Sequence, residues 1–90
     1  MNKAELSNEI GKSLKQLTII DKKIYSKYGM WRLEFGKWEA TVYPSFLMGN
    51  TFVIEIKEKG VPEIKHLGQL PFEKIDSLKE LLENILNDYR

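Results

Sequence analysis

The hydrophobic residues at the start of the chain recur at helical intervals. They lie three, four or seven residues apart, which places them on one stripe of a helix: Leu6, Ile10, Leu14, Leu17 and Ile24. The pattern predicts a helix from near the amino terminus to Gly29, since glycine accepts the left-handed conformation that often closes a helix. The sequence Thr-Ile-Ile at residues 18–20 opposes the second half of this helix, because β-branched side chains lose rotamer freedom there.

Lysines fall on the opposite side of this predicted helix: Lys12, Lys15, Lys22, Lys23 and Lys27. Such a row of cations could follow the phosphates of a nucleic acid, and it is the basis of an alternative function. The simpler explanation is the solvent-exposed side that a surface helix has opposite its apolar stripe. Tyr25 and Tyr28 lie closer to the stripe and are interpreted as packing residues.

Two alternating segments, residues 30–35 and 38–43, predict a β-hairpin around the sequence Gly-Lys at residues 36–37. Glycine in the first position of a two-residue loop is what a type II′ turn requires. The predicted register places six apolar or small residues on one face, in the pairs Phe35 with Trp38, Leu33 with Ala40 and Trp31 with Val42. Turn chemistry and hydrophobic pattern therefore favour the same register.

The rest of the chain predicts two further strands and a second helix. The strands lie near residues 51–57 and 63–67, and the helix carries an apolar stripe of Ile75, Leu78, Leu82, Ile85 and Tyr89. The element order is α-β-β-β-β-α. It predicts an α+β fold, a two-layer sandwich in which two helices cover one face of a four-stranded, mainly antiparallel sheet. A length of 90 residues suits one domain that spans residues 1–90.

The second and third strands differ in the parity of their apolar positions. The sequence Gly-Asn at residues 49–50 is a favourable hairpin turn, and as the turn it pairs Leu47 with Phe52. Leu47 would then share the helix-covered face with Val42, although one position is odd and the other even. A one-residue bulge at the sequence Pro-Ser, residues 44–45, resolves the conflict, because proline cannot donate to a strand ladder.

The predicted bulge creates a candidate partner-binding surface. It turns apolar side chains onto the uncovered face of the sheet: Tyr43, Phe46, Met48 and Val53. Exposed apolar patches of this kind often mark protein-binding sites. Two other interpretations remain, namely a loop over residues 44–50 whose Phe46 folds back over the core, and a contact between two copies of the chain.

Composition excludes several kinds of chemistry. The chain has no cysteine, so disulfides and thiolate metal sites are excluded, and its one histidine, His66, has no second histidine to complete a metal site. Glu34 and Glu39 face each other in the predicted hairpin, but beside a solvated turn, where a salt-bridged surface is a better explanation than an acid/base pair. We therefore predict no catalytic residue, no metal and no cofactor. With no membrane span or signal peptide in the pattern, we expect a cytoplasmic protein.

The charge distribution adds a modest asymmetry. The formal net charge is +1, but residues 1–29 carry +3 and residues 70–90 carry −2. This is well below the excess of a dedicated nucleic-acid binder. The sequence thus predicts a small non-enzymatic domain that binds another protein or a second copy of itself. Its size and lysine-rich composition suit an accessory or inhibitor protein of a phage or mobile element. The alternative is nucleic-acid binding through the predicted lysine face.

Overall fold

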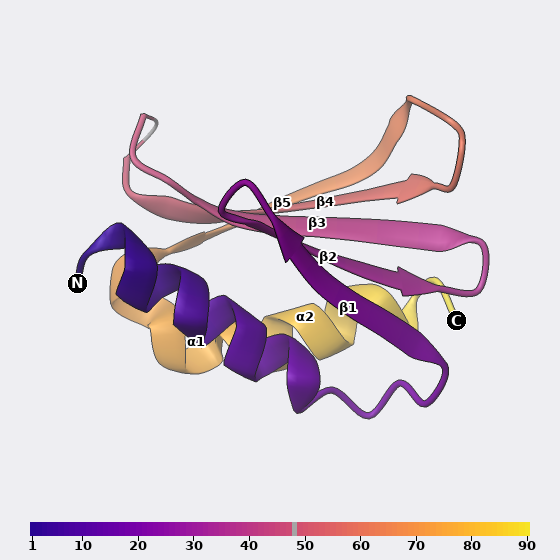
Figure 1. The fold of residues 1–90 in the computed structure, drawn as a ribbon, viewed down its shortest axis with the longest axis horizontal. Coiled ribbons are helices and arrows are strands. Elements are labelled where there is room, and N and C mark those ends of the chain that lie inside the picture. The colour runs from indigo at the N-terminus through magenta and orange to yellow at the C-terminus, as the bar shows by residue number, and fades with distance from the viewer. Residues whose placement is uncertain (48) are drawn as a thin grey trace.

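The computed structural model describes residues 1–47 and 49–90 and contains two layers. Figure 1 shows a sheet above and both helices below it, on the same face. The elements are α1 (Lys3–Lys15), β1 (Lys22–Lys27), β2 (Met30–Phe35), β3 (Trp38–Ser45), β4 (Thr51–Glu58), β5 (Ile64–Pro71), the 3-10 helix η1 (Phe72–Ser77) and α2 (Leu78–Asn87). The strands are antiparallel and lie in sequence order across the sheet. The predicted α+β class is confirmed, but the sheet has five strands and not four.

The additional strand comes from a segment that the sequence pattern assigned to the first helix. The helix starts at a capping box, in which the Asn2 side chain accepts from the Glu5 backbone N–H, and it ends at Lys15. The prediction that it extends to Gly29 is wrong. Residues 18–20 are β-branched or favour extended backbone, and residues 22–27 form β1 with Ile24 directed at the core. The connection over residues 16–21 separates the two elements.

The predicted hairpin between β2 and β3 is confirmed. Phe35 pairs with Trp38, and the ladder continues through Leu33 with Ala40 to Trp31 with Val42. Gly36 has φ of +55°, the conformation for which glycine is suited at the first position of the turn.

The predicted bulge between β3 and β4 is wrong. The two strands pair without a register shift from Trp38 with Glu58 to Ser45 with Thr51, so Pro44 and not Leu47 faces Phe52. Both positions are even, and the parity conflict does not arise. The connection spans residues 46–50, because the strands stop pairing before the sequence Gly-Asn is reached.

One hydrophobic core lies between the sheet and the two helices. The face of the sheet that the helices cover is called here the inner face. The core includes Leu6, Ile10, Leu14, Leu33, Val42, Phe52, Ile54, Ile56, Leu78, Leu82 and Leu86, all fully buried or nearly so. Trp31 packs at its edge on α1, where its ring lies so close to Gly11 that a Cβ atom there would overlap it. Absence of a side chain at Gly11 therefore sets how closely α1 approaches β2.

Candidate functional site

The face of the sheet opposite the helices is uncovered (Figure 1) and is called here the open face. Tyr43 and Val53 pair across β3 and β4 on this face, close to the β3–β4 connection, as the predicted interaction surface requires for these two residues. Val53 is 7% exposed, so its neighbours already cover it. The Tyr43 hydroxyl donates to Glu55 Oε1 at 3.2 Å. Burial raises the pKa of Tyr43, and the charge of Glu55 and this hydrogen bond raise it further.

Phe46, a third residue of the predicted surface, does not join Tyr43 and Val53. Phe46 lies in the connection after β3, and its ring contacts that of Phe72 edge to face, with centroids 5.2 Å apart. Phe72 in turn contacts the core residue Phe52, with ring centroids 5.0 Å apart. Phe46, which is 48% exposed, therefore extends an aromatic cluster at the end of the core. This agrees with the loop interpretation for Phe46, but Pro44 and Ser45 belong to β3 and not to a loop. Met48 lies outside the described residues.

The five lysines assigned to one helical face belong to two different elements. Lys12 and Lys15 are in α1, whereas Lys22, Lys23 and Lys27 are in β1. Within β1 the side chains alternate: Lys22 lies on the inner side, where its Nζ donates to the Leu17 carbonyl oxygen, and Lys23 and Lys27 lie on the open face. The predicted lysine face therefore does not exist as a single surface.

The β1–β2 hairpin carries a partly exposed cluster that includes Tyr25 and Tyr28, the two residues that the sequence pattern assigned to packing. Its members line a shallow hollow of about 270 Å³ and are called here the hairpin patch: Tyr25, Lys27, Tyr28, Met30 and Arg32. Tyr28 is 89% exposed and Met30 36% exposed, so the interpretation of Tyr28 as a packing residue is wrong. The available signal was Gly29 directly before the alternating segment 30–35, because glycine is the usual second residue of a two-residue hairpin turn.

Tyr28 holds an unusual backbone conformation. It has φ of +56°, and Gly29 after it has φ of +76°, as in a type I′ turn. Asparagine or glycine is typical of the first position of such a turn, because a side chain with a bulky Cβ substituent is strained there. The Lys27 ammonium lies 5.4 Å from the centroid of the Tyr28 ring. An exposed aromatic ring is thus held at the tip of the hairpin at a cost in backbone energy.

Ion pairs are unevenly distributed over the sheet. Among the described residues, their cations are Arg32, Lys37, Lys57, Lys59 and Lys65, all on β2, β4, β5 or the connecting turns. Glu34 and Glu39 face each other as predicted, and each has its own cation: Lys59 lies 3.5 Å from Glu34, and Arg32 lies 3.3 Å from Glu39. These carboxylates therefore form a salt-bridged surface. Among the described residues, the lysines of β1 take part in none of these ion pairs.

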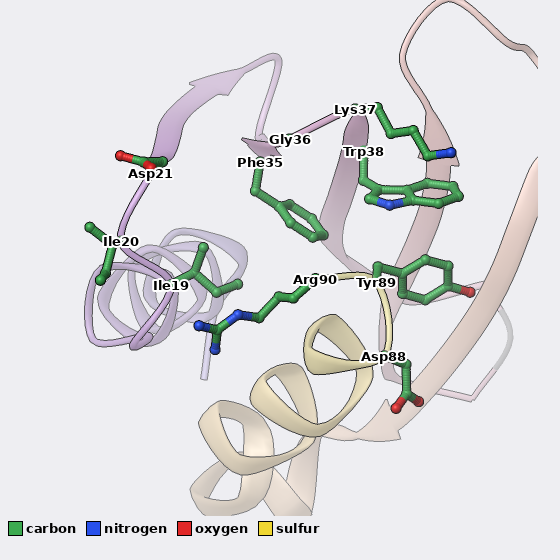
Figure 2. Close-up of a pocket in the computed structure, with 10 residues that line it drawn as sticks. All are labelled: Ile19, Ile20, Asp21, Phe35, Gly36, Lys37, Trp38, Asp88, Tyr89 and Arg90. Atoms are coloured by element: carbon green, nitrogen blue, oxygen red, sulfur yellow. The ribbon is translucent and has the colours of Figure 1, made fainter.

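A separate hollow of about 690 Å³ lies at one end of the two layers, where the α1–β1 connection, the β2–β3 turn and the end of α2 meet (Figure 2). Trp38 and Tyr89 lie side by side in it, with ring centroids 4.8 Å apart and planes at 71°. Its charged lining residues are two acids, Asp21 and Asp88, and two bases, Lys37 and Arg90. This balance of charges favours no particular ligand.

The remaining candidate groups do not assemble into a reactive site. His66 lies on the inner side of β5 with its ring centroid 6.4 Å from that of Tyr89. Within residues 1–47 and 49–90, no three His, Asp or Glu side chains are grouped so that they could hold a metal ion. No helix of this part of the chain has the length and apolar character needed to cross a membrane.

Comparison of the chain with protein-family models, curated proteins and solved structures gives no significant match.

Proposed function

We propose that this chain is a small protein-interaction domain that binds its partner through the hairpin patch and the adjoining open face. The observation that carries the proposal is Tyr28, a ring that is 89% exposed on a backbone with φ of +56°. A bulky side chain in this backbone conformation costs about 1–2 kcal/mol relative to the ordinary extended or helical conformations. Because the ring packs against no core residue, its role is expected to lie outside the fold.

The composition of the hairpin patch supports protein binding. Tyrosine, methionine and arginine are enriched where proteins contact one another, and they supply much of the binding energy there. Four of the five patch residues are of these types: Tyr25, Tyr28, Met30 and Arg32. Paired strands hold the backbone of Tyr25, Met30 and Arg32, and the two-residue turn between the strands holds that of Tyr28, so little backbone entropy would be lost on binding.

Site-specific crosslinking tests the proposal. A photoreactive phenylalanine at position 28 should give a discrete protein adduct in extract from the native cell, before and after nuclease treatment. The same group at position 20 is the matched control, because Ile20 is 88% exposed but lies in the α1–β1 connection, away from the patch.

Competition makes the test specific. Unlabelled wild-type protein should suppress the adduct, and the Tyr28→Asn variant should not, although its turn is better suited to the fold. Equal adducts from positions 28 and 20, or competition by Tyr28→Asn as effective as that by wild type, would contradict the proposal.

Nucleic-acid binding is the second candidate, and one observation favours it. Tyr25 and Tyr28 each lie beside a lysine, with Lys23 Nζ 5.7 Å from the Tyr25 ring and Lys27 Nζ 5.4 Å from the Tyr28 ring. Aromatic rings that stack on bases, together with cations that follow the backbone, are the elements of single-strand recognition. This candidate predicts an adduct to nucleic acid that nuclease removes, and affinity that falls steeply with salt.

A further inference from the structure

Building on the proposed function, we propose that the free edge of β1 binds an extended acidic peptide segment of the partner as a sixth strand of the sheet. Three features carry this inference: backbone groups of β1 that face away from β2, two lysines of β1 that enter no ion pair among the described residues, and a second sheet edge that is poorly suited to the same role. The occupant is thus a polypeptide, and its charge is negative.

Some backbone N–H and C=O groups of β1 point away from the sheet and are not used in its pairing with β2. β1 is the first strand in the sheet order and pairs only with β2. The pair Lys27 and Met30 flanks the two-residue turn, so it is a hydrogen-bonded pair, and hydrogen-bonded pairs recur at every second residue of an antiparallel ladder. Ile24 and Ser26 lie between these pairs, and their N–H and C=O groups are directed outward. An added strand would accept and donate at these two residues.

The lysine side chains beside this edge favour a peptide with acidic residues. Lys23 and Lys27 are exposed on the open face and flank Tyr25. Within the described residues neither lysine enters an ion pair. Glu34 lies opposite Lys23 in the β1–β2 ladder, but its carboxylate is paired with Lys59 at 3.5 Å. Directly opposed side chains of neighbouring strands are about 5 Å apart at Cβ. Acidic residues at alternate positions of an added strand would therefore lie next to both lysines.

The same lysines disfavour other strands. A second copy of β1 would bring its own lysines to the edge, and like charges opposed across a ladder repel. The peptide thus has to supply the complementary charge, which makes the recognition selective.

The opposite edge of the sheet, at β5, is less suited to this role. Its register with β4 shifts between Ile56 and Lys57, and it ends at Pro71, which has no N–H to donate. Lys65 already lies 3.8 Å from Glu63. The pairing of β5 is therefore irregular, and its lysine already has an acidic partner. The edge at β1 is regular, and its lysines enter no ion pair among the described residues.

A synthetic peptide tests the inference directly. The probe is a capped peptide of about seven residues in which Glu and Thr alternate, a length and composition typical of a strand. Added to the full chain labelled with nitrogen-15, it should shift the backbone amide signals of Ile24 and Ser26 and slow their hydrogen exchange. The same peptide with Lys in place of Glu should leave these signals unchanged.

A backbone control separates strand addition from simple charge attraction. An acidic peptide methylated at alternate backbone nitrogens keeps its charge but loses the donors that face β1. We expect its affinity to fall at least about tenfold, a change equivalent to about 1.4 kcal/mol. Equal binding of the methylated peptide would overturn the inference, as would the absence of any shift with about 1 mM unmethylated peptide, a concentration at which even weak binding is visible.

Charge-reversal variants test whether the peptide binds at the edge of β1. The double variant Lys23→Glu/Lys27→Glu should weaken peptide binding at least about tenfold, a loss expected when two attractive charges become repulsive. Lys12→Glu/Lys15→Glu in α1 is the matched control and should retain affinity within about twofold, because these residues are outside β1. Equal losses in the two variants would show attraction by overall charge and would overturn the assignment to β1.

An oligonucleotide distinguishes the other class of partner. A single-stranded thymidine oligomer of about ten nucleotides should bind more weakly than the acidic peptide. If it binds more tightly and shifts the same amides, the inference is overturned in favour of nucleic acid. If the peptide fails but position 28 still crosslinks to a protein, the proposed function stands and only strand addition at β1 is rejected.

Discussion

The indole of Trp31 lies against α1 at Gly11, and its Nε1–H donates to Ser7 Oγ at 3.0 Å. This relationship joins the sheet to the helix layer at the edge of the core. The first prediction follows from it. Gly11→Ala should lower the free energy of unfolding by about 1–3 kcal/mol, because the new methyl group would overlap the Trp31 ring. Alanine ordinarily stabilises a helix by about 1 kcal/mol relative to glycine, so the expected sign is reversed here.

Urea denaturation would measure this effect. Asn8→Ala is the control, since Asn8 is an exposed residue of the same helix and its replacement should change stability by less than about 0.5 kcal/mol. A Gly11→Ala variant that is more stable than wild type would show that Trp31 can move aside.

The turn at Tyr28 gives the second prediction. Tyr28→Asn should raise the free energy of unfolding by about 0.5–1 kcal/mol, because asparagine adopts positive φ with less strain. For a domain of this size, an increase of 1 kcal/mol corresponds to a rise of about 4–8 °C in Tm. Thermal melting by circular dichroism would measure the change. Tyr28→Ala removes the same ring but keeps the strained conformation, so it should give no comparable gain.

Phe46 gives the third prediction. Phe46→Ala should destabilise the fold by about 1 kcal/mol, because the ring loses its edge-to-face contact with Phe72. Leu47→Ala is the matched control: Leu47 is 94% exposed in the same connection and should change stability by less than about 0.5 kcal/mol. If both variants unfold like wild type while Phe46→Ala no longer binds the crosslinked partner, Phe46 belongs to the interface and not to the fold.

The burial of Tyr43 beside Glu55 gives a prediction about high pH. The pKa of Tyr43 is raised in the folded protein above its ordinary value of 10.0. Below pH 10 the neutral phenol is present in both states and the stabilisation is complete. As the pH rises above 10, Tyr43 ionises first in the unfolded chain, so stability is lost until the folded phenol also ionises.

Carbon-13 signals of the tyrosine rings, followed by NMR, would test this order. One ring should titrate later than the ordinary value, and Tyr43→Phe should remove that signal. Glu55→Gln should move its midpoint towards 10, because the neighbouring negative charge is removed. A Tyr43 ring that titrates at the ordinary value in wild type would contradict the prediction.

The candidate site was only partly predictable. Tyr43 and Val53 lie on the open face as expected, but Phe46 does not, and the hairpin patch was missed. The reason is one element: a helix through residue 29 assigns Tyr25 and Tyr28 to a packed stripe, whereas the strand β1 places Tyr25 on the open face and Tyr28 in a turn. The seven-residue spacing between Leu17 and Ile24 agrees with a helical stripe, yet Ile24 reaches the same core from a strand.

Local chemistry by itself determined the α+β class, the start of α1 and the register of β2 against β3, because caps, turn residues and alternation act over a few neighbouring positions. Only the tertiary structure decided that residues 22–27 pair with β2, that β3 and β4 continue in register to Ser45, and that Phe46 contacts Phe72. These outcomes depend on contacts between segments distant in sequence. There the burial of apolar surface outweighs the small differences in local backbone preference.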